Sequence, residues 1–326
     1  MIGIFSIQAP ALAAALLAGA GTERFTFREI HMACDTRVTV YAPDEPRAAA
    51  AARRAFDRIA GIERALSDWM PSSEVRRLPQ RAGVRTPVSP DLRAALEAAL
   101  LLARATDGRF DPTVAPVVAL WRQARRSGTL PDAAAVAEAR AHTGWRHVDL
   151  DEEGVAFRID GIRLDFGGIG KGYAAAEAAR TLRDAGFPRA LVAVAGDVSS
   201  AWTPPGRSAW VVEVDAGDGA GDAALLGPWM SISTSGDINQ FVEIAGVRYS
   251  HIIDPATGIG VSHRTESTVV TPAGPLADGL ATSLCVVKPE EAVPLVGKVP
   301  GASARLVRGG SSPPRIECTP GFPLRR

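Results

Sequence analysis

Four glycines within six residues constrain the fold of this chain more than any other feature of its sequence. They are Gly167, Gly168, Gly170 and Gly172, and they separate a strand-like apolar stretch from a helical apolar period. Glycine lets backbone amides approach a ligand closely, and the first turn of a helix offers unpaired N–H groups with a partial positive charge. The segment therefore predicts a strand, a tight turn and a helix that bind a phosphate, with Lys171 as the point charge. A tight turn with a solvated lysine is the alternative.

Two common phosphate-binding loops do not match this segment. A Walker A loop requires glycine at position 165 and serine or threonine at 172, where the chain has Asp165 and Gly172. A dinucleotide-binding fingerprint requires glycine at position 173, where the chain has Tyr173. The glycine-rich turn therefore belongs to some other kind of phosphate site.

Composition limits the classes of protein to consider. The chain has 326 residues, 46% of them hydrophobic and 22% charged, which is enough apolar material for a large core. Lysine plus arginine equals aspartate plus glutamate at 36 each, so no net field favours a nucleic acid as partner. The chain has three cysteines, Cys34, Cys285 and Cys318. Their odd number and the lack of a CxxC spacing exclude a disulfide framework and a cysteine zinc site.

Hydrophobic periodicity predicts an α+β protein with mixed or antiparallel sheets and packed helices. Strands are expected at 25–30, 36–41, 148, 155–159, 162–166, 191–194, 210–214, 231–233, 241–244 and 267–271. Helices are expected at 46–66, 89–107, 131–142, 173–185 and 275–286, and a surface loop at 216–228.

The two ends of the chain differ from the rest. Residues 1–20 form an apolar run that ends in Ala18-Gly19-Ala20, the small-x-small pattern cut by signal peptidase, and Ala20 stands where a lipoprotein would have cysteine. We expect a signal peptide or an N-terminal anchor here, and hence a protein exported to the periplasm or facing it at the inner membrane. A misplaced start codon or a cytosolic extension is the alternative. Residues 24–308 are expected to form the functional domain, and 309–326 a loosely held tail.

A candidate metal site lies near the start of the last predicted helix. Asp278 and Thr282 are four residues apart and therefore share one face of that helix. Their oxygens are hard ligands of the kind magnesium prefers, together with waters and phosphate oxygens. An aspartate that only complements the helix dipole is the alternative.

Further candidates are a histidine and two aromatic residues. His251 ends a predicted strand just before a turn with Pro255 and Gly258, and a histidine there can accept a proton near neutral pH. Trp69 and Phe110 offer flat surfaces on which a heteroaromatic ligand could stack. The alternatives are a structural histidine bonded to a carbonyl group and aromatic residues that belong to the core.

Taken in order, these segments resemble the FAD:protein FMN transferases, the ApbE family, over about residues 28–288. The resemblance rests on Met32-Ala33-Cys34, residues 67–78, Gly108-Arg109-Phe110-Asp111-Pro112-Thr113-Val114 with Trp121, residues 165–173, Ala195-Gly196-Asp197, Thr234-Ser235-Gly236-Asp237, residues 251–258, and Ala277-Asp278 with Thr282.

The resemblance implies a T-fold-like architecture over residues 24–308, FAD as the flavin donor, and Mg²⁺ as cofactor. It implies as acceptor a threonine or serine in another protein, such as a subunit of a membrane redox complex or an FMN-binding domain. Carried over by position, the metal would be held by the Gly168 carbonyl, Asp278 and Thr282, and His251 would be the base. The FAD site would consist of Met32, Trp69, Arg109, Phe110, Asp111, Asp165, Lys171 and Ile252.

The implied reaction is a phosphoryl transfer. The acceptor hydroxyl attacks the FMN-side phosphorus of FAD, AMP leaves, and His251 removes the hydroxyl proton. If water replaces the acceptor, the same site hydrolyses FAD to FMN and AMP. A Mg²⁺-dependent FAD pyrophosphatase and a non-catalytic flavin-binding protein are therefore the two alternative functions.

Some positions depart from the family pattern, although the metal and base positions do not. The family usually has Met-Gly-Thr at 32–34, asparagine at 79, an acid at 176 and glycine at 195. This chain has Ala33, Cys34, Pro79, Ala176 followed by Glu177, and Ala195. The departures concern contacts around the flavin and the adenosine.

Overall fold

An eight-stranded antiparallel sheet is the frame of the structure, a computed structural model that describes residues 21–214, 222–237, 240–309 and 314–325. Residues 1–20, where we expect a signal peptide or anchor, lie outside the described residues. The strand order is β1-β2-β5-β6-β9-β14-β15-β16. These strands are β1 (Glu23–His31), β2 (Cys34–Ala42), β5 (Ala190–Val194), β6 (Asp197–Ser200), β9 (Ser231–Ser235), β14 (Thr265–Thr271), β15 (Ser303–Arg308) and β16 (Arg315–Cys318).

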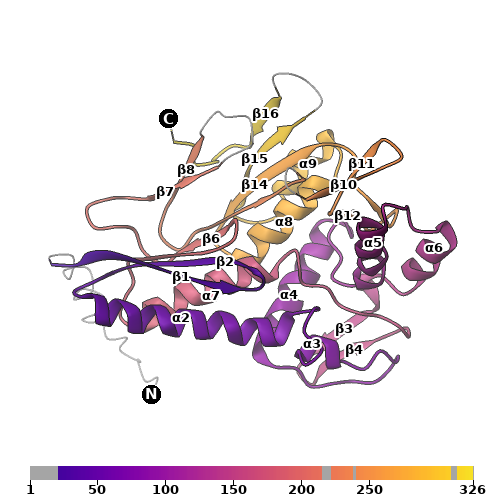
Figure 1. The fold of residues 1–326 in the computed structure, drawn as a ribbon, viewed down its shortest axis with the longest axis horizontal. Helices are drawn as coiled ribbons and strands as arrows, with labels where there is room; N and C mark the ends of the chain where they lie inside the picture. Colours follow the sequence, from indigo (N-terminus) through magenta and orange to yellow (C-terminus); the bar gives the residue numbers. More distant parts are fainter. Residues whose placement is uncertain (1–20, 215–221, 238–239, 310–313, 326) are drawn as a thin grey trace, which may run out of the picture.

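Three helices cover one face of this sheet and enclose the main core (Figure 1). They are α2 (Glu45–Leu66), α7 (Gly170–Asp184) and α8 (Gly274–Val286), and α4 (Pro90–Ala105) packs against α2 and α8. Local signals explain the helix starts, because the Asp44 side chain caps α2 and Ser89 caps α4, each with proline in the first turn. The α+β fold with antiparallel sheets and packed helices is thus confirmed.

Shorter elements surround this frame. The hairpin of β7 (Trp210–Glu213) and β8 (Ala223–Leu226) forms a second small core with β6, β9 and β14. A third core joins α5 (Ala115–Ser127) to the hairpins β10 (Phe241–Ile244) with β11 (Val247–Ser250) and β12 (Ile253–Asp254) with β13 (Ile259–Gly260). The remaining elements are α3 (Glu74–Arg77), α6 (Ala133–Ala141), the 3₁₀ turn η1 (Trp145–His147), β3 (Val148–Asp151), β4 (Gly154–Phe157) and α9 (Pro289–Val296).

The structure corrects three of the expected elements. Residues 162–166 do not form a strand of a sheet; Arg163 makes one isolated bridge to Val114, because this extended stretch finds no neighbouring strand before the glycine-rich turn. The expected surface loop at 216–228 contains strand β8, which is mostly buried and pairs with β7. Residues 309–326 are not simply a loosely held tail, since β16 pairs with β15 and the Leu225 N–H donates to the Pro323 carbonyl. All three errors concern pairing with distant segments, which short-range periodicity does not contain.

Membrane-spanning helices are not found in the described part of the chain, where every helix is too short or too polar to cross a bilayer.

Two of the departures from the family pattern fall on backbone that favours glycine. Ala33 has a φ of 58° in the β1–β2 turn, and Ala195 has a φ of 52° in the β5–β6 turn. The left-handed conformation costs an L-residue about 1–2 kcal/mol, whereas glycine adopts it freely. Both positions thus require a left-handed backbone, which the glycine usual in the family adopts without strain. This chain adopts the same conformation with alanine.

Ala33→Gly and Ala195→Gly are each expected to raise the free energy of unfolding by about 0.5–1 kcal/mol. The expected gain is the difference between two effects: glycine relieves the strain of the left-handed backbone, but it also loses more conformational entropy on folding than alanine does. Urea unfolding of each variant measures the effect. The matched control is Ala137→Gly on the exposed side of α6, where the same substitution should destabilise by about 1 kcal/mol. A loss of stability in both turn variants would contradict the expectation.

Candidate active site

A lysine between two buried aspartates forms the centre of the candidate site. Lys171 Nζ lies 3.1 Å from Asp197 Oδ2 and 3.6 Å from Asp278 Oδ2, and both aspartates are almost completely buried. The Gly172 N–H, in the first turn of α7, donates to Asp278 Oδ2 over 3.1 Å. Three segments that are far apart in the sequence therefore place their charges together.

Two glycines allow this arrangement. A Cβ atom on Gly172 would collide with the Gly274 carbonyl oxygen, and one on Gly274 would collide with the Gly172 carbonyl oxygen. The N-terminal turns of α7 and α8 therefore touch backbone to backbone, which brings Asp278 to the Gly172 N–H at the start of α7. The predicted tight turn into a helix is therefore present, and the Gly172 N–H at its start is directed at a carboxylate of the protein itself.

The three residues predicted to hold a metal lie together. Thr282 is one turn after Asp278 on α8, and a Cβ atom on Gly168 would lie 3.3 Å from Thr282 Oγ1. Thr282 Oγ1 is also 3.3 Å from Ser235 Oγ. The described residues contain no cluster of three or more histidine, cysteine or acidic side chains that could hold a metal ion, so an ion here would depend on hydroxyl and carbonyl oxygens beside the one carboxylate. One carboxylate, one hydroxyl and one backbone carbonyl are a donor set of hard oxygens, which fits Mg²⁺ completed by waters and phosphate oxygens.

Burial and neighbouring charges shift the pKa values of Asp278 and Lys171. Burial raises the pKa of Asp278 above its usual range, and the neighbouring Asp197 raises it further, while Lys171 opposes the shift. Burial by itself would lower the pKa of Lys171, but Asp197 and Asp278 raise it above its usual value. The lysine therefore remains a cation. An additional positive charge beside Asp278 would stabilise its ionised carboxylate.

His251 presents one ring nitrogen for catalysis. Its Nδ1 lies 3.1 Å from the Gln240 carbonyl oxygen, which can only accept, so Nδ1 carries the hydrogen and neutral Nε2 is left with a lone pair. Burial lowers the pKa of His251, and the charges of Arg125 and Lys171 lower it further, against the effect of the Gln240 carbonyl. The charge of Lys171 thus acts on both His251 and Asp278.

With His251 as the base that the resemblance implies, this lowered pKa predicts the pH dependence of FMN transfer. Nε2 can accept a proton only while the ring is neutral, so activity is kept above the pKa of His251 and lost below it. Since that pKa lies below the ordinary 6.5, the rate should stay level from pH 8 to 6.5 and fall tenfold per pH unit only at lower pH. Single-turnover transfer of FMN at saturating FAD and Mg²⁺ measures this profile. A fall that begins above pH 6.5 would contradict it.

Several residues predicted to line the FAD surround the glycine-rich turn. Phe110 and Met32 flank it, since Cβ atoms on Gly168 and Gly170 would lie 3.1 Å from Phe110 Cε2 and 3.4 Å from Met32 Cε. Trp69 is 70% exposed and Arg122 lies over one face of its ring, which leaves the other face for a ligand to stack on. Asp165, whose pKa is raised by burial, bonds the Gly167 N–H at the start of the turn.

Three other predicted FAD residues make contacts within the protein. The buried Asp111 carboxylate accepts hydrogen bonds from the N–H groups of Thr113 and Trp145, so it braces the loop after α4. Arg109 forms an ion pair with Glu291 of α9, with 3.3 Å between Nη2 and Oε1. Ile252 is buried in a small apolar cluster with Val261, Cys285 and Val286. These contacts hold the loops that border the glycine-rich turn.

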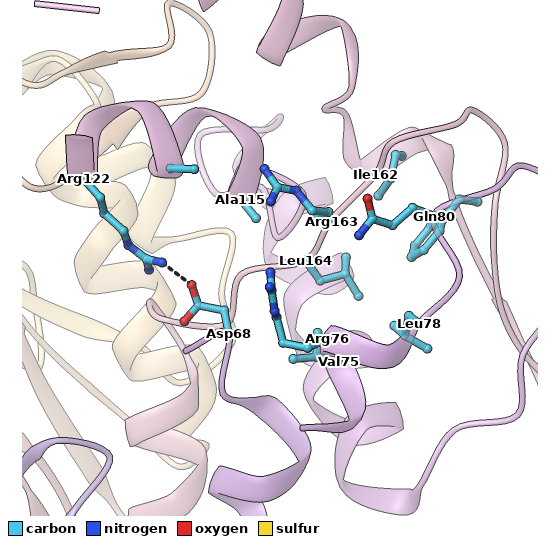
Figure 2. A pocket seen from close by; sticks show the side chains of 12 residues that line it. Asp68, Val75, Arg76, Leu78, Gln80, Ala115, Arg122, Ile162, Arg163 and Leu164 are labelled. Atoms are coloured by element: carbon cyan, nitrogen blue, oxygen red, sulfur yellow. Dashed lines mark hydrogen bonds and ion pairs between the residues drawn. The ribbon is translucent and has the colours of Figure 1, made fainter. Parts of the chain in front are cut away.

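Two residues with no predicted role lie in the site. Asp197 is the closest partner of Lys171, and its signal was the tight Ala195-Gly196 turn just before it. Arg122 lies over the Trp69 ring, 4.0 Å from its centroid, and also pairs with Asp68 (Figure 2) and with Asp165. Arg122 belongs to α5, a helix that sequence periodicity did not predict, so its position was not foreseeable.

Comparisons with known proteins agree with this geometry. The family model described as "ApbE family" matches residues 32–306. An FAD:protein FMN transferase of Klebsiella pneumoniae is 33% identical over 285 residues, covering 84% of this chain and 81% of the relative, and that of Salmonella typhimurium is 32% identical over 271 residues, covering 80% and 77%.

Solved structures show the same fold. Pseudomonas stutzeri flavinyl transferase ApbE has a TM-score of 0.80 at 27% identity, covering 92% of this chain and 95% of that one. An ApbE protein of Thermotoga maritima has a TM-score of 0.80 at 26% identity, covering 91% and 97%. The matching family model, the curated relatives and the shared fold together show that the chain belongs to the ApbE family of FAD:protein FMN transferases.

Proposed function

We propose that this site uses Mg²⁺ to transfer the FMN half of FAD to a threonine or serine hydroxyl of another protein, with release of AMP. The observation that carries the proposal is the cluster of Lys171, Asp197 and Asp278 at the glycine-rich turn, whose lysine also acts electrostatically on His251. A base, a fixed cation and a hard-oxygen donor set are the parts that a phosphoryl transfer requires.

Asp278, Thr282 and the Gly168 carbonyl would hold the Mg²⁺. The fit rests on the buried Asp278 carboxylate and on the closeness of Gly168 to the Thr282 hydroxyl. A bound Mg²⁺ would neutralise the negative charge that builds up on the phosphate oxygens. Lys171 and the positive end of the α7 helix dipole contribute positive charge at the glycine-rich turn, which would orient the pyrophosphate.

His251 acts on the acceptor. The hydroxyl oxygen forms a bond to the FMN-side phosphorus, the bond from that phosphorus to the bridging oxygen breaks, and AMP leaves with that oxygen. The hydroxyl proton passes to Nε2, which is free because Nδ1 is bonded to the Gln240 carbonyl. The exposed ring of Trp69, held by Arg122, would stack against a flat ring system of FAD.

One experiment separates transfer from hydrolysis. The protein is incubated with FAD and Mg²⁺, with and without a co-expressed candidate acceptor, and released AMP is measured together with the mass of the acceptor. We expect an FMN adduct on a threonine or serine and AMP release that depends on the acceptor. Rapid AMP release without any acceptor, and no adduct, would instead indicate an FAD pyrophosphatase.

We further propose that the protein acts outside the cytoplasm, on a subunit of a membrane redox complex or an FMN-binding domain. The support is the apolar run at 1–20 with its Ala18-Gly19-Ala20 ending, together with the family resemblance. Cell fractionation, with mass spectrometry of the mature N-terminus, tests this location. Recovery of the intact chain in the cytoplasmic fraction would contradict it.

A further inference from the structure

His251 is held at two points by one backbone carbonyl group. The Gln240 carbonyl oxygen lies 3.0 Å from the main-chain nitrogen of His251 and 3.1 Å from its Nδ1. A carbonyl oxygen has two lone pairs and can accept both hydrogens. The direction of this carbonyl group therefore decides which ring nitrogen carries the hydrogen, and so whether Nε2 can accept a proton.

This carbonyl group lies at one end of the two-stranded β10–β11 hairpin. Gln240 precedes the first residue of β10 and His251 follows the last residue of β11, so the bond between them is the final rung of the ladder. Farther along, the hairpin packs on α5, where the rings of Tyr249 and Trp121 meet (Figure 1). A two-stranded hairpin is only marginally stable by itself, and the ends of such elements fray. The Gln240 carbonyl group therefore needs a further restraint to keep its direction.

Arg248 restrains the residues on both sides of Gln240. Its Nε donates to Asp237 Oδ2 over 2.8 Å, and its Nη2 donates to the Asp237 carbonyl oxygen over 2.6 Å. Its guanidinium carbon also lies 3.5 Å from the centroid of the Phe241 ring. Arg248 thus fixes the side chain and the backbone of a residue three positions before Gln240, and the side chain directly after it.

Burial makes this contact difficult for water to replace. The Asp237 side chain is 9% exposed and the Arg248 side chain is 18% exposed. A buried carboxylate that loses its counter-charge is costly, and turning it toward water relieves that cost. Without the arginine, Asp237 would move outward, and the chain that leads from it to Gln240 would move with it.

We propose that Arg248 is a positioning residue for the reaction. By holding Asp237 and Phe241, it directs the Gln240 carbonyl group at Nδ1 of His251 and so keeps Nε2 free. The inference rests on the proposed function, in which His251 is the base. The reactivity of this histidine then depends on an arginine that acts through the backbone and exchanges no proton itself.

The first test measures the tautomer of the ring and needs no substrate. Two-bond ¹H–¹⁵N correlation spectra of the full-length protein with ¹⁵N-labelled histidine are recorded at pH 8, and the signal missing in His251→Ala is assigned to His251. We expect the hydrogen on Nδ1 in the wild-type protein. In Arg248→Gln we expect a shift toward the form with the hydrogen on Nε2, which prevails for a histidine side chain free in water.

The second test measures FMN transfer. Arg248→Gln should lower kcat by about 10–100-fold, because a misplacement of about 1 Å at a catalytic group can cost up to 100-fold in rate. The KM for FAD should stay within about twofold, since the lost interaction orients the base and does not bind the flavin. Lysine keeps the charge but not the planar fork or the stacking, so Arg248→Lys should lie between the wild type and Arg248→Gln in both tests.

Arg85→Gln is the matched control. Arg85 also binds two carboxylates and a carbonyl group of one hairpin, since it pairs with Asp149 and Asp151 and donates to the Gly154 carbonyl oxygen. Its loss should lower thermal stability, as in the other variants, but leave the histidine tautomer unchanged and kcat within about twofold of wild type. Thermal unfolding checks that each variant is folded.

Three results would overturn the inference: hydrogen on Nε2 of His251 in the wild-type protein, an Nδ1–H signal that persists unchanged in Arg248→Gln, or a fall of kcat no larger in Arg248→Gln than in Arg85→Gln. If Arg248→Gln does not fold, Arg248→Lys decides, and a tautomer and kcat equal to those of the wild type would contradict the proposed role. If the wild-type protein transfers no FMN, that result counts against the proposed function, and the tautomer spectra still decide the role of Arg248.

Discussion

His251→Ala is expected to reduce the rate of FMN transfer by about 10²–10⁴-fold while FAD still binds. The imidazole acts on the proton of the acceptor, and its Nε2 is free only because Nδ1 bonds the Gln240 carbonyl. Single-turnover transfer measures the loss, and quenching of flavin fluorescence measures binding. Because a small base can enter the space left by the side chain, added imidazole should restore part of the rate.

His263→Gln is the matched control for this variant. His263 is exposed and its Nε2 lies 3.0 Å from the Cys285 carbonyl, so it too is a histidine bonded to backbone, but it does not interact with the Lys171 cluster. We expect its transfer rate to remain within about twofold of wild type. If His251→Ala weakened FAD binding as much as it slowed transfer, the histidine would be a flavin contact and not the base.

Asp278→Asn is expected to abolish the dependence of transfer on Mg²⁺ and to slow transfer by at least about 100-fold. Asparagine keeps the shape of the side chain and can still accept the hydrogen bond from the Gly172 N–H, so the change removes mainly the charge. A metal ion contributes several kcal/mol of transition-state stabilisation, and each 1.4 kcal/mol corresponds to about a factor of ten. Titration of activity with Mg²⁺ measures both effects.

The control for Asp278→Asn is the same substitution at a helix cap. Asp44 caps α2 at an exposed position, and asparagine caps a helix about equally well, so Asp44→Asn should leave transfer and its Mg²⁺ dependence unchanged. Thermal unfolding of both variants confirms that they are folded. Normal Mg²⁺ stimulation in Asp278→Asn would remove this residue from the metal site.

Local sequence signals predicted a large part of the frame. The β1–β2 hairpin follows from alternating β-branched and aromatic residues, and α2 and α4 follow from apolar periodicity with a side-chain cap and an early proline. Helix α5 was missed because its N-cap residue, Val114, makes no side-chain cap, and the helix follows directly after a motif that looks like a loop. With it, Arg122 and one wall of a small cavity lined by Arg76, Arg122 and Arg163 (Figure 2) were also missed.

What the sequence by itself determined is the chemistry present: a glycine-rich turn with Lys171, an aspartate and a threonine one helical turn apart, and a histidine before a turn. These are local patterns, fixed by the residues that stand next to each other. Only the tertiary structure decided that Lys171 lies between Asp197 and Asp278, and that Arg76 and Arg163 share a cavity. The reason is that contacts between distant segments depend on close packing, above all on the backbone contact of Gly172 with Gly274. No short stretch of sequence encodes such a contact.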